Sequence, residues 1–215
     1  MKKRYLALFL TLAMVFTLTA CAKKETKVEE GTPQATAGQE AAQSTPEKEK
    51  KYVEMKVKGY GTMQIELDPN VAPDTVDNFM NLVHDEFYNG LTFHRIIPGF
   101  MIQGGDPLGD GTGGSEHKVR GEFAANGFAN PLGHTRGVIS MARAADYNSA
   151  SSQFFIMHQD YPSLDGQYAA FGQVINGIEV VDKICEDVQT EDSNGSVKAK
   201  NQPVIKYIKE IEKPN

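Results

Sequence analysis

Two polar side chains within one apolar stretch are the residues of this chain best placed to do chemistry. Residues 93–106 read FHRIIPGFMIQGGD and hold Arg95 and Gln103 among bulky apolar residues. The residues expected to seek burial are Phe93, Ile96, Ile97, Phe100, Met101 and Ile102. A guanidinium is always charged and donates directed hydrogen bonds, and a carboxamide both donates and accepts them. Such groups at the rim of an apolar surface suit an apolar ligand that carries a carbonyl group.

Other common catalytic and ligand-binding patterns are missing from the sequence. The five histidines form no HExxH motif and no cysteine cluster joins them, so no metal site is expected. The serines lie in no GxSxG motif, which argues against a serine hydrolase. Residues 109–114, GDGTGG, have the glycine spacing of a dinucleotide-binding loop, but more loop is expected after them instead of a helix. We therefore expect a surface loop there, and no cofactor.

The elements that must position Arg95 and Gln103 begin with a predicted β-hairpin. Apolar and polar residues alternate over 53–57 and again over 63–67, with glycines between the two runs. From Pro73 the apolar spacing becomes helical and continues to Phe87, which predicts a helix that ends near Gly90.

A second pair of strands is predicted around Pro98 and Gly99, which are typical of a tight turn. This pairing would place Arg95 and Gln103 on neighbouring strands. His94 would then point to the opposite face from Arg95, where it either orients neighbouring groups or is a buried polar residue with no further role.

The remaining sequence predicts further short strands and one more helix. The strands are expected at residues 137–141, 154–157, 169–174 and 204–211, and the helix after Gly177. Strands that do not alternate with helices argue against a parallel sheet. The expected fold class is mainly β, a closed or nearly closed antiparallel β-barrel of about eight strands capped by two α-helices.

The first 20 residues have the pattern of an export signal. Lys2, Lys3 and Arg4 precede an apolar run that is short for a membrane span. The run ends in LTAC, and small residues before a cysteine resemble the lipobox of bacterial lipoproteins. This resemblance implies lipidation of Cys21 and anchoring at the extracytoplasmic face of the cell membrane. An ordinary signal peptide with a chance cysteine and an uncleaved anchor are the alternatives.

Residues 21–50 have the composition of a disordered tether, and residues 51–215 that of one folded domain. The first segment is rich in Ala, Glu, Lys, Gln, Thr and Pro and has no aromatic residue. Removing residues 1–20 takes away three cations and changes the formal net charge from −6 to −9, which argues against nucleic acid as a partner. Cys185 would be the only cysteine of the domain, so no internal disulfide is possible.

Three segments together resemble one enzyme family. They are FHRIIPGFMIQGGD, GVISMARAADYNSASSQFFIMH at residues 137–158, and LDGQYAAFGQV at residues 164–174. In this order they are similar to the signatures of cyclophilin-type peptidyl-prolyl cis-trans isomerases. The resemblance implies a groove that binds a proline ring and its flanking amide carbonyls.

The resemblance also implies roles for individual residues. Arg95 and Gln103 are the expected catalytic residues. Substrate contacts are expected from Phe100, Met101, Ala142, Arg143, Gln153, Phe155, Leu164 and Tyr168. Among these, the backbone of Ala142 and Arg143 would clamp the peptide, Gln153 would brace the site, and Phe155 would form a wall of the pocket.

Two positions depart from the family pattern. Ser163 stands where an aromatic residue is frequent, and Tyr168 stands where a histidine is frequent. The missing aromatic residue weakens any expectation of tight cyclosporin binding. Tyr168 still offers an apolar ring and a hydroxyl group, so the pocket itself is expected to remain.

The expected function is acceleration of rotation about X-Pro bonds in exported, proline-containing polypeptides that are still folding. The alternative is a non-catalytic module that binds proline-containing segments as a chaperone or scaffold. The presence of both Arg95 and Gln103 favours the enzyme. The protein is expected to act as a monomer, and the sequence does not identify its client proteins.

Overall fold

The computed structural model describes residues 47–214. The predicted signal peptide, the predicted lipidation site Cys21 and the tether as far as residue 46 lie outside the described residues, and they stay predictions.

Eight strands and two α-helices form within residues 47–214. The strands are β1 (Lys51–Val57), β2 (Gly61–Leu67), β3 (Thr92–Ile97), β4 (Met101–Asp106), β5 (Val138–Met141), β6 (Phe154–Met157), β7 (Ala170–Asn176) and β8 (Ile205–Ile211). The helices are α1 (Pro73–His84) and α2 (Glu179–Asp187). The predicted hairpin, the two strands around Pro98 and Gly99, and the later strands and helix are thereby confirmed.

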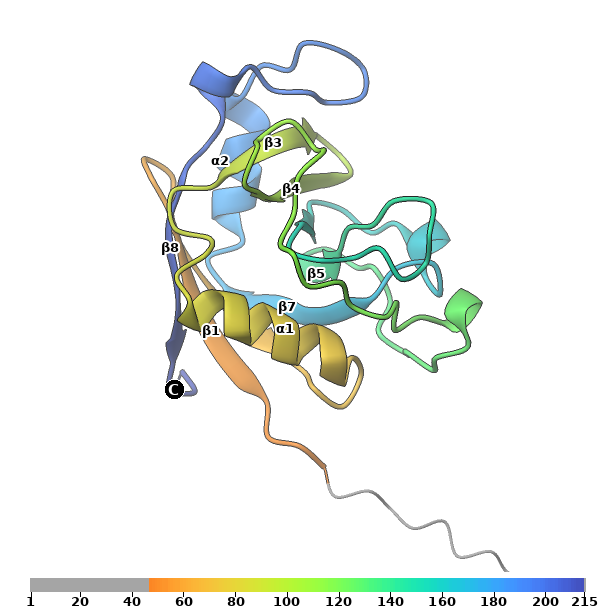
Figure 1. The fold of residues 1–215 in the computed structure, drawn as a ribbon. Helices are drawn as coiled ribbons and strands as arrows, with labels where there is room; N and C mark the ends of the chain where they lie inside the picture. Colours follow the sequence, from red (N-terminus) through yellow and green to blue (C-terminus); the bar gives the residue numbers. More distant parts are fainter. Residues whose placement is uncertain (1–46, 215) are drawn as a thin grey trace, which may run out of the picture. The chain divides into compact units, whose positions relative to one another are not determined.

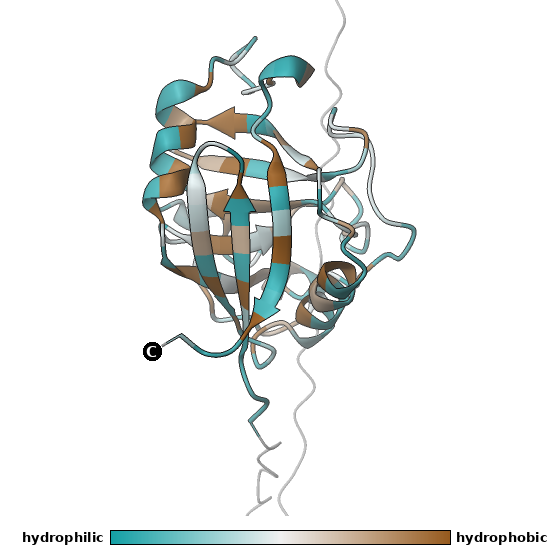
Figure 2. Ribbon diagram, turned by 90° about the vertical axis from the view of Figure 1, so that its left-hand side faces the viewer, coloured by the Kyte–Doolittle hydropathy of each residue, from teal (hydrophilic) through white to brown (hydrophobic). Residues whose placement is uncertain are grey.

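All strands belong to one curled antiparallel sheet, ordered β3-β4-β6-β5-β7-β2-β1-β8. Figure 1 shows α1 and α2 at different ends of this sheet. Hydrophobic and hydrophilic residues alternate along β1 and β2, and Figure 2 shows this mixed colouring on the strands nearest the viewer. The hydrophobic side chains of these strands therefore lie on one face of the sheet, where they pack into the core.

The predicted closed barrel is not confirmed, because the edge strands β3 and β8 do not form a continuous ladder. They are joined by one isolated bridge, between Thr92 and Val204. The outer edge of β3 instead bonds to the segment before β8, where Ile96 N donates to Gly195 O at 2.8 Å and Val197 N donates to the carbonyl of His94 at 3.0 Å. This segment pairs with backbone groups at the outer edge of β3 in place of β8, and the sheet stays open.

Helix α1 ends earlier than predicted, at His84 instead of near Gly90. Glu86 has a φ of 54°, which stops the helix. Phe87 lies in the turn after α1, where it is partly buried and packs against the core. Its side chain therefore contributes to the core as the helical spacing suggested, although its backbone is not helical.

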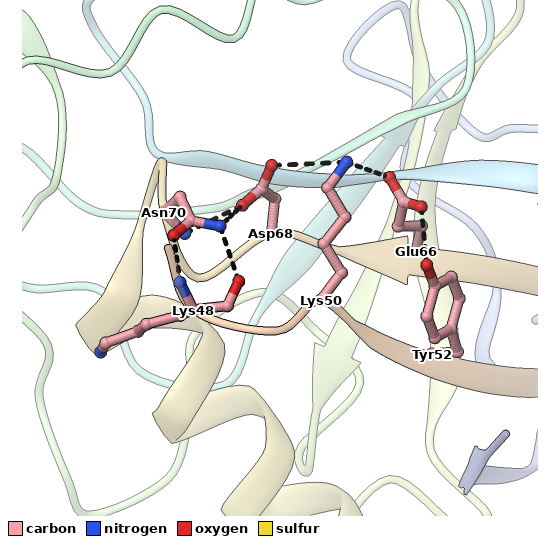
Figure 3. Close-up of polar contacts among 6 residues, drawn as sticks. All are labelled: Lys48, Lys50, Tyr52, Glu66, Asp68 and Asn70. Carbon is pink, nitrogen blue, oxygen red and sulfur yellow. Dashed lines mark hydrogen bonds and ion pairs between the residues drawn. The ribbon is translucent and has the colours of Figure 1, made fainter. Parts of the chain in front are cut away.

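The last residues of the predicted tether contact the domain (Figure 3). Lys48 N donates to Asn70 Oδ1 at 2.8 Å, and Asn70 Nδ2 donates back to Lys48 O at 3.0 Å. Lys50 Nζ lies 2.7 Å from Glu66 Oε1, and Tyr52 donates its hydroxyl hydrogen to the other oxygen of Glu66 at 3.1 Å. The chain is thus held against β2 and the turn after it before β1 begins.

The core inside the sheet centres on aromatic rings. Phe154 meets Phe79, Tyr88 and Phe93 edge-on, with ring centroids 5.7, 5.5 and 6.0 Å apart. All four side chains are buried. A second, smaller apolar cluster, formed by Met101, Val138, Phe155, Met157 and Ala170, is separate from this core.

Candidate active site

The hairpin of β3 and β4 places Arg95 opposite Gln103. The two residues lie on neighbouring strands, as predicted, and the structure shows that they pair directly in the antiparallel ladder. Pro98 and Gly99 form the turn, Gly99 has a φ of 81°, and Phe100 N donates to Ile97 O at 2.9 Å. Glycine is required at the third position of such a type II turn because its φ is positive.

Arg95 is held on two sides. Its Nη1 donates to Gln103 Oε1 at 3.2 Å, and its Nε and Nη2 donate to the backbone carbonyl and the side-chain oxygen of Asn194 at 2.8 and 3.3 Å. Burial lowers the pKa of the guanidinium from its ordinary value, against the opposing effects of Tyr168 and Asp192. A guanidinium still keeps its charge, so Arg95 presents a fixed cation.

Gln103 continues this network towards the glycine-rich loop. Its Nε2 donates to Gln153 Oε1 at 2.9 Å, and Gln153 Nε2 donates to the carbonyl oxygens of Gly111 and Gly113 at 3.1 and 2.8 Å. Gln153 therefore braces Gln103, as predicted for it. The loop at residues 109–114 is a surface loop, and it borders the site.

A cavity of about 230 Å³ opens beside Arg95. It is lined by Arg95, Phe100, Met101, Gln103, Ala142, Arg143, Phe155, Leu164 and Tyr168. Phe155 meets Tyr168 edge-on at 5.8 Å, and Phe100 contacts the ring of Tyr161 at 4.5 Å. The structure thus brings every predicted site residue of the domain to this cavity except Gln153, which contacts it through Gln103.

A second cavity of about 220 Å³ shares Gln103, Ala142 and Arg143 with the first. Gln153 and the glycine-rich loop form part of its wall. The two cavities therefore adjoin at these three residues, and the second is lined mainly by polar residues and glycines.

The side chain of Arg143 packs among aromatic rings. Its guanidinium carbon lies 5.1, 4.7 and 4.6 Å from the ring centroids of Phe123, Tyr147 and Tyr168. Its Nε and Nη2 donate to Gln167 O at 3.1 and 2.9 Å. This packing ties the loop after β5 to the loop before β7, so the side chain holds in place the backbone that was predicted to clamp a peptide.

The comparisons with known proteins agree with this geometry. Residues 52–210 match the model of the family described as cyclophilin type peptidyl-prolyl cis-trans isomerase/CLD. The chain belongs to this cyclophilin family. It is an isomerase, and the enzyme interpretation of the sequence is thereby confirmed over the non-catalytic module.

Individual relatives show how far the similarity extends. A peptidyl-prolyl cis-trans isomerase of Helicobacter pylori strain J99 is 46% identical over 126 residues, which cover 58% of this chain and 75% of the relative. Peptidyl-prolyl cis-trans isomerase B of Bacillus subtilis is 46% identical over 117 residues, which cover 54% and 78%.

Solved cyclophilin structures share the fold. A crystal structure of a cyclophilin type isomerase from Cryptosporidium parvum matches with a TM-score of 0.67 and 31% identity, covering 77% of this chain and 100% of that one. A second structure of that protein, obtained in the presence of the dipeptide Ala-Pro, matches with a TM-score of 0.66 and 32% identity, covering 75% and 99%.

Sequence reasoning missed several groups that support the cyclophilin pocket from behind. His134 is buried, its Nδ1 lies 2.9 Å from Asp165 Oδ1, and its Nε2 lies 3.0 Å from Ser140 Oγ. Its ring stacks on Phe155 with centroids 5.9 Å apart. Burial lowers the pKa of His134, against the opposing effect of Asp165. His134 and Asp165 are distant in sequence from Phe155, and Asn194 is distant from Arg95, so no local sequence pattern marks these supporting residues.

His94 is buried, but it does not point to the opposite face from Arg95 as predicted, because the register of β3 shifts between Phe93 and Arg95, and His94 lines a cavity together with Arg95 and Gln103. Both of its ring nitrogens lack a hydrogen-bond partner among the described atoms. Burial lowers its pKa, with Asp106 opposing the shift.

Within residues 47–214, no three His, Cys, Asp or Glu side chains are grouped as metal ligands. No helix of that part of the chain is long and apolar enough to cross a membrane.

Proposed function

We propose that this isomerase binds the proline ring of a polypeptide in the apolar cavity and uses Arg95 to accelerate rotation of the X-Pro bond. The observation that carries the proposal is the placement of Arg95, held by Asn194 and Gln103, at the wall of a cavity that Phe100, Met101, Phe155 and Leu164 also line. An apolar ring fits such a wall, and an amide next to that ring comes within reach of Arg95.

The chemistry requires no covalent intermediate. Amide resonance gives the peptide bond a rotational barrier of about 18–20 kcal/mol. A catalyst must therefore bind the twisted amide better than either planar isomer. Twisting makes the proline nitrogen pyramidal and more basic, so a hydrogen bond from Arg95 to that nitrogen, or to the adjacent carbonyl, stabilises the twisted state selectively.

Preorganisation of Arg95 supports this role. Asn194 and Gln103 together hold three of its nitrogens, so the guanidinium need not reorganise as the amide twists. Gln103 is the neighbouring donor and acceptor, and we assign it to a flanking carbonyl or amide of the substrate.

The second cavity supplies the hold on the rest of the peptide. Its wall includes Ala142, Arg143 and Gln153. If the chain on one side of the X-Pro bond is fixed there, only the other side must turn. The Ala-Pro dipeptide present with the Cryptosporidium relative supports proline-containing peptides as the substrate class.

We further propose that the enzyme acts as a monomer on exported polypeptides at the outer face of the cell membrane. Residues 1–20 carry three cations followed by an apolar run, and Cys21 follows small residues. A lipid on Cys21 would anchor the protein without a spanning helix, and residues 22–46 would tether the domain.

The activity is tested by NMR exchange spectroscopy on a proline-containing tetrapeptide, with and without the purified protein. Faster cis-trans exchange at substoichiometric protein is expected, and no enhancement would contradict the proposed activity. Location is tested separately by labelling cells with a radioactive fatty acid. Label is expected in the protein and not in Cys21→Ala, whereas a soluble, unlabelled protein would refute the anchor.

A further inference from the structure

His158, the residue after β6, connects the turn of the β3–β4 hairpin to helix α2. Its side chain is 17% exposed, and its Nδ1 accepts a hydrogen bond from Gly99 N at 2.8 Å. Its Nε2 lies 3.2 Å from Asp182 Oδ1. Arg136 completes the arrangement, because Nη2 donates to Asp182 Oδ2 at 2.8 Å and Nη1 donates to the carbonyl of His158 at 2.7 Å.

These contacts specify the proton on the imidazole. A backbone N–H can only donate, so Nδ1 must hold a lone pair towards Gly99. The remaining ring hydrogen is then on Nε2, where it points to the carboxylate of Asp182. The arrangement therefore requires the neutral imidazole with its hydrogen on Nε2, and a proton added at Nδ1 would break the bond to Gly99.

The same residue also holds the pocket wall through its backbone. Gly99 immediately precedes Phe100, whose ring lines the apolar cavity. The carbonyl of Phe100 accepts from the backbone N of His158 at 2.9 Å and from that of Gln159 at 3.4 Å. The imidazole and the backbone of His158 thus fix the peptide units on the two sides of Phe100.

We propose that His158 is a positioning residue for the isomerase reaction, which sets the Phe100 wall of the proline pocket through its bond to Gly99. The proposal rests on the proposed role of Phe100 in binding proline. The predicted consequence of losing this bond is a weaker hold on the substrate, with the bond rotation itself little changed.

Two substitutions of similar shape test the contacts of the two ring nitrogens one at a time. In His158→Asn the amide oxygen can take the place of Nδ1 and accept from Gly99, although the link to Asp182 is lost. In His158→Gln the amide nitrogen can take the place of Nε2 and donate to Asp182, but no acceptor faces Gly99. His158→Ala removes both contacts. His84→Asn, at an imidazole on α1 that pairs with Glu210, is the matched control.

The experiment measures KM and kcat for a proline tetrapeptide and the hydrogen-exchange protection of the Gly99 amide. We expect KM to rise about three- to tenfold in His158→Gln and His158→Ala, with protection lost and kcat changed little. His158→Asn should retain both within about twofold, as His84→Asn should.

Two results would overturn the role of His158. One is an unchanged KM and a protected Gly99 amide in His158→Gln. The other is an equal rise of KM in the Asn, Gln and Ala variants, which would indicate general structural damage. Phe100→Ala separates this proposal from the proposed function. An unchanged KM in Phe100→Ala would refute the pocket itself, whereas a raised KM there with a normal His158→Gln would refute only His158.

Discussion

Phe154 and Phe155 are consecutive residues of β6, and they serve opposite sides of the sheet. Phe154 is fully buried in the aromatic core and contacts Phe79, Tyr88 and Phe93. Phe155 is also buried, but it belongs to the smaller cluster with Met101 and faces the cavity beside Arg95. The period of two in a strand makes one residue part of the core and its neighbour part of the pocket.

The two apolar regions differ in how they are completed. The core is enclosed by strands and by both helices, so its rings contact one another on all sides. The pocket cluster is completed by loop residues, by the polar network of Arg95 and Gln103, and by His134 behind Phe155. Stability and substrate binding therefore draw on different faces of the same strands and should be separable by substitution.

The largest expected effect is therefore on stability, in Phe154→Ala. Loss of a fully buried ring should lower the free energy of unfolding by about 3–5 kcal/mol, measured by urea denaturation. In Phe155→Ala the loss should be about half as large because the ring already borders a cavity, while kcat/KM should fall at least about tenfold. Equal losses of stability in the two variants would break the distinction between the two faces.

Two histidines that are buried outside the aromatic core, His94 and His134, should make stability depend on pH. Burial lowers the pKa of His94 and of His134. Below about pH 6.5 the unfolded chain binds protons on these residues that the folded chain does not, so stability should fall as pH falls. We expect a loss of about 1–2 kcal/mol between pH 7.5 and 5.5.

The measurement is urea unfolding at the two pH values, where the carboxylates stay ionised. His134→Gln should remove part of the pH-dependent loss, and His94→Gln another part. A stability that does not change over this range in the wild-type protein would contradict the assignment of both rings as buried and neutral.

A smaller effect is expected at Arg143, on the pocket side alone. Arg143→Lys keeps the charge but cannot stack its head group on Phe123, Tyr147 and Tyr168 or donate two bonds to Gln167 O. We expect KM for a proline tetrapeptide to rise about threefold with stability changed by less than about 1 kcal/mol. If stability falls and KM does not, Arg143 belongs to the core side of the comparison.

How much the sequence could predict depended on the range of each interaction. Alternation and turn residues are local, so the hairpin that carries Arg95 and Gln103 on neighbouring strands was predicted, although its register was not. The closed barrel is not confirmed because the edge of β3 is bonded to residues around Gly195, which no local sequence pattern marks. Helix α1 was predicted too long because Phe87 keeps the apolar spacing after the backbone has left the helix.

Within the site, the same distinction holds. Residues carried by family-like segments were placed correctly at the cavity, including Phe155 and Leu164. Asn194 and the pair of His134 and Asp165 were missed because their partners are distant in sequence and are set by packing. His158 was missed because its role depends on which ring nitrogen faces Gly99, which only coordinates reveal.

The proposed mechanism requires that the Arg95 cation accelerates the rotation of the X-Pro bond. The most direct measurement is the cis-trans exchange rate of a bound proline tetrapeptide, by NMR, for the wild-type protein, Arg95→Ala and Arg95→Lys at equal saturation. The account predicts at least a tenfold fall for Arg95→Ala and a smaller fall for Arg95→Lys, with unchanged circular dichroism. Exchange in Arg95→Ala as fast as in the wild-type protein, with the fold intact, would contradict it.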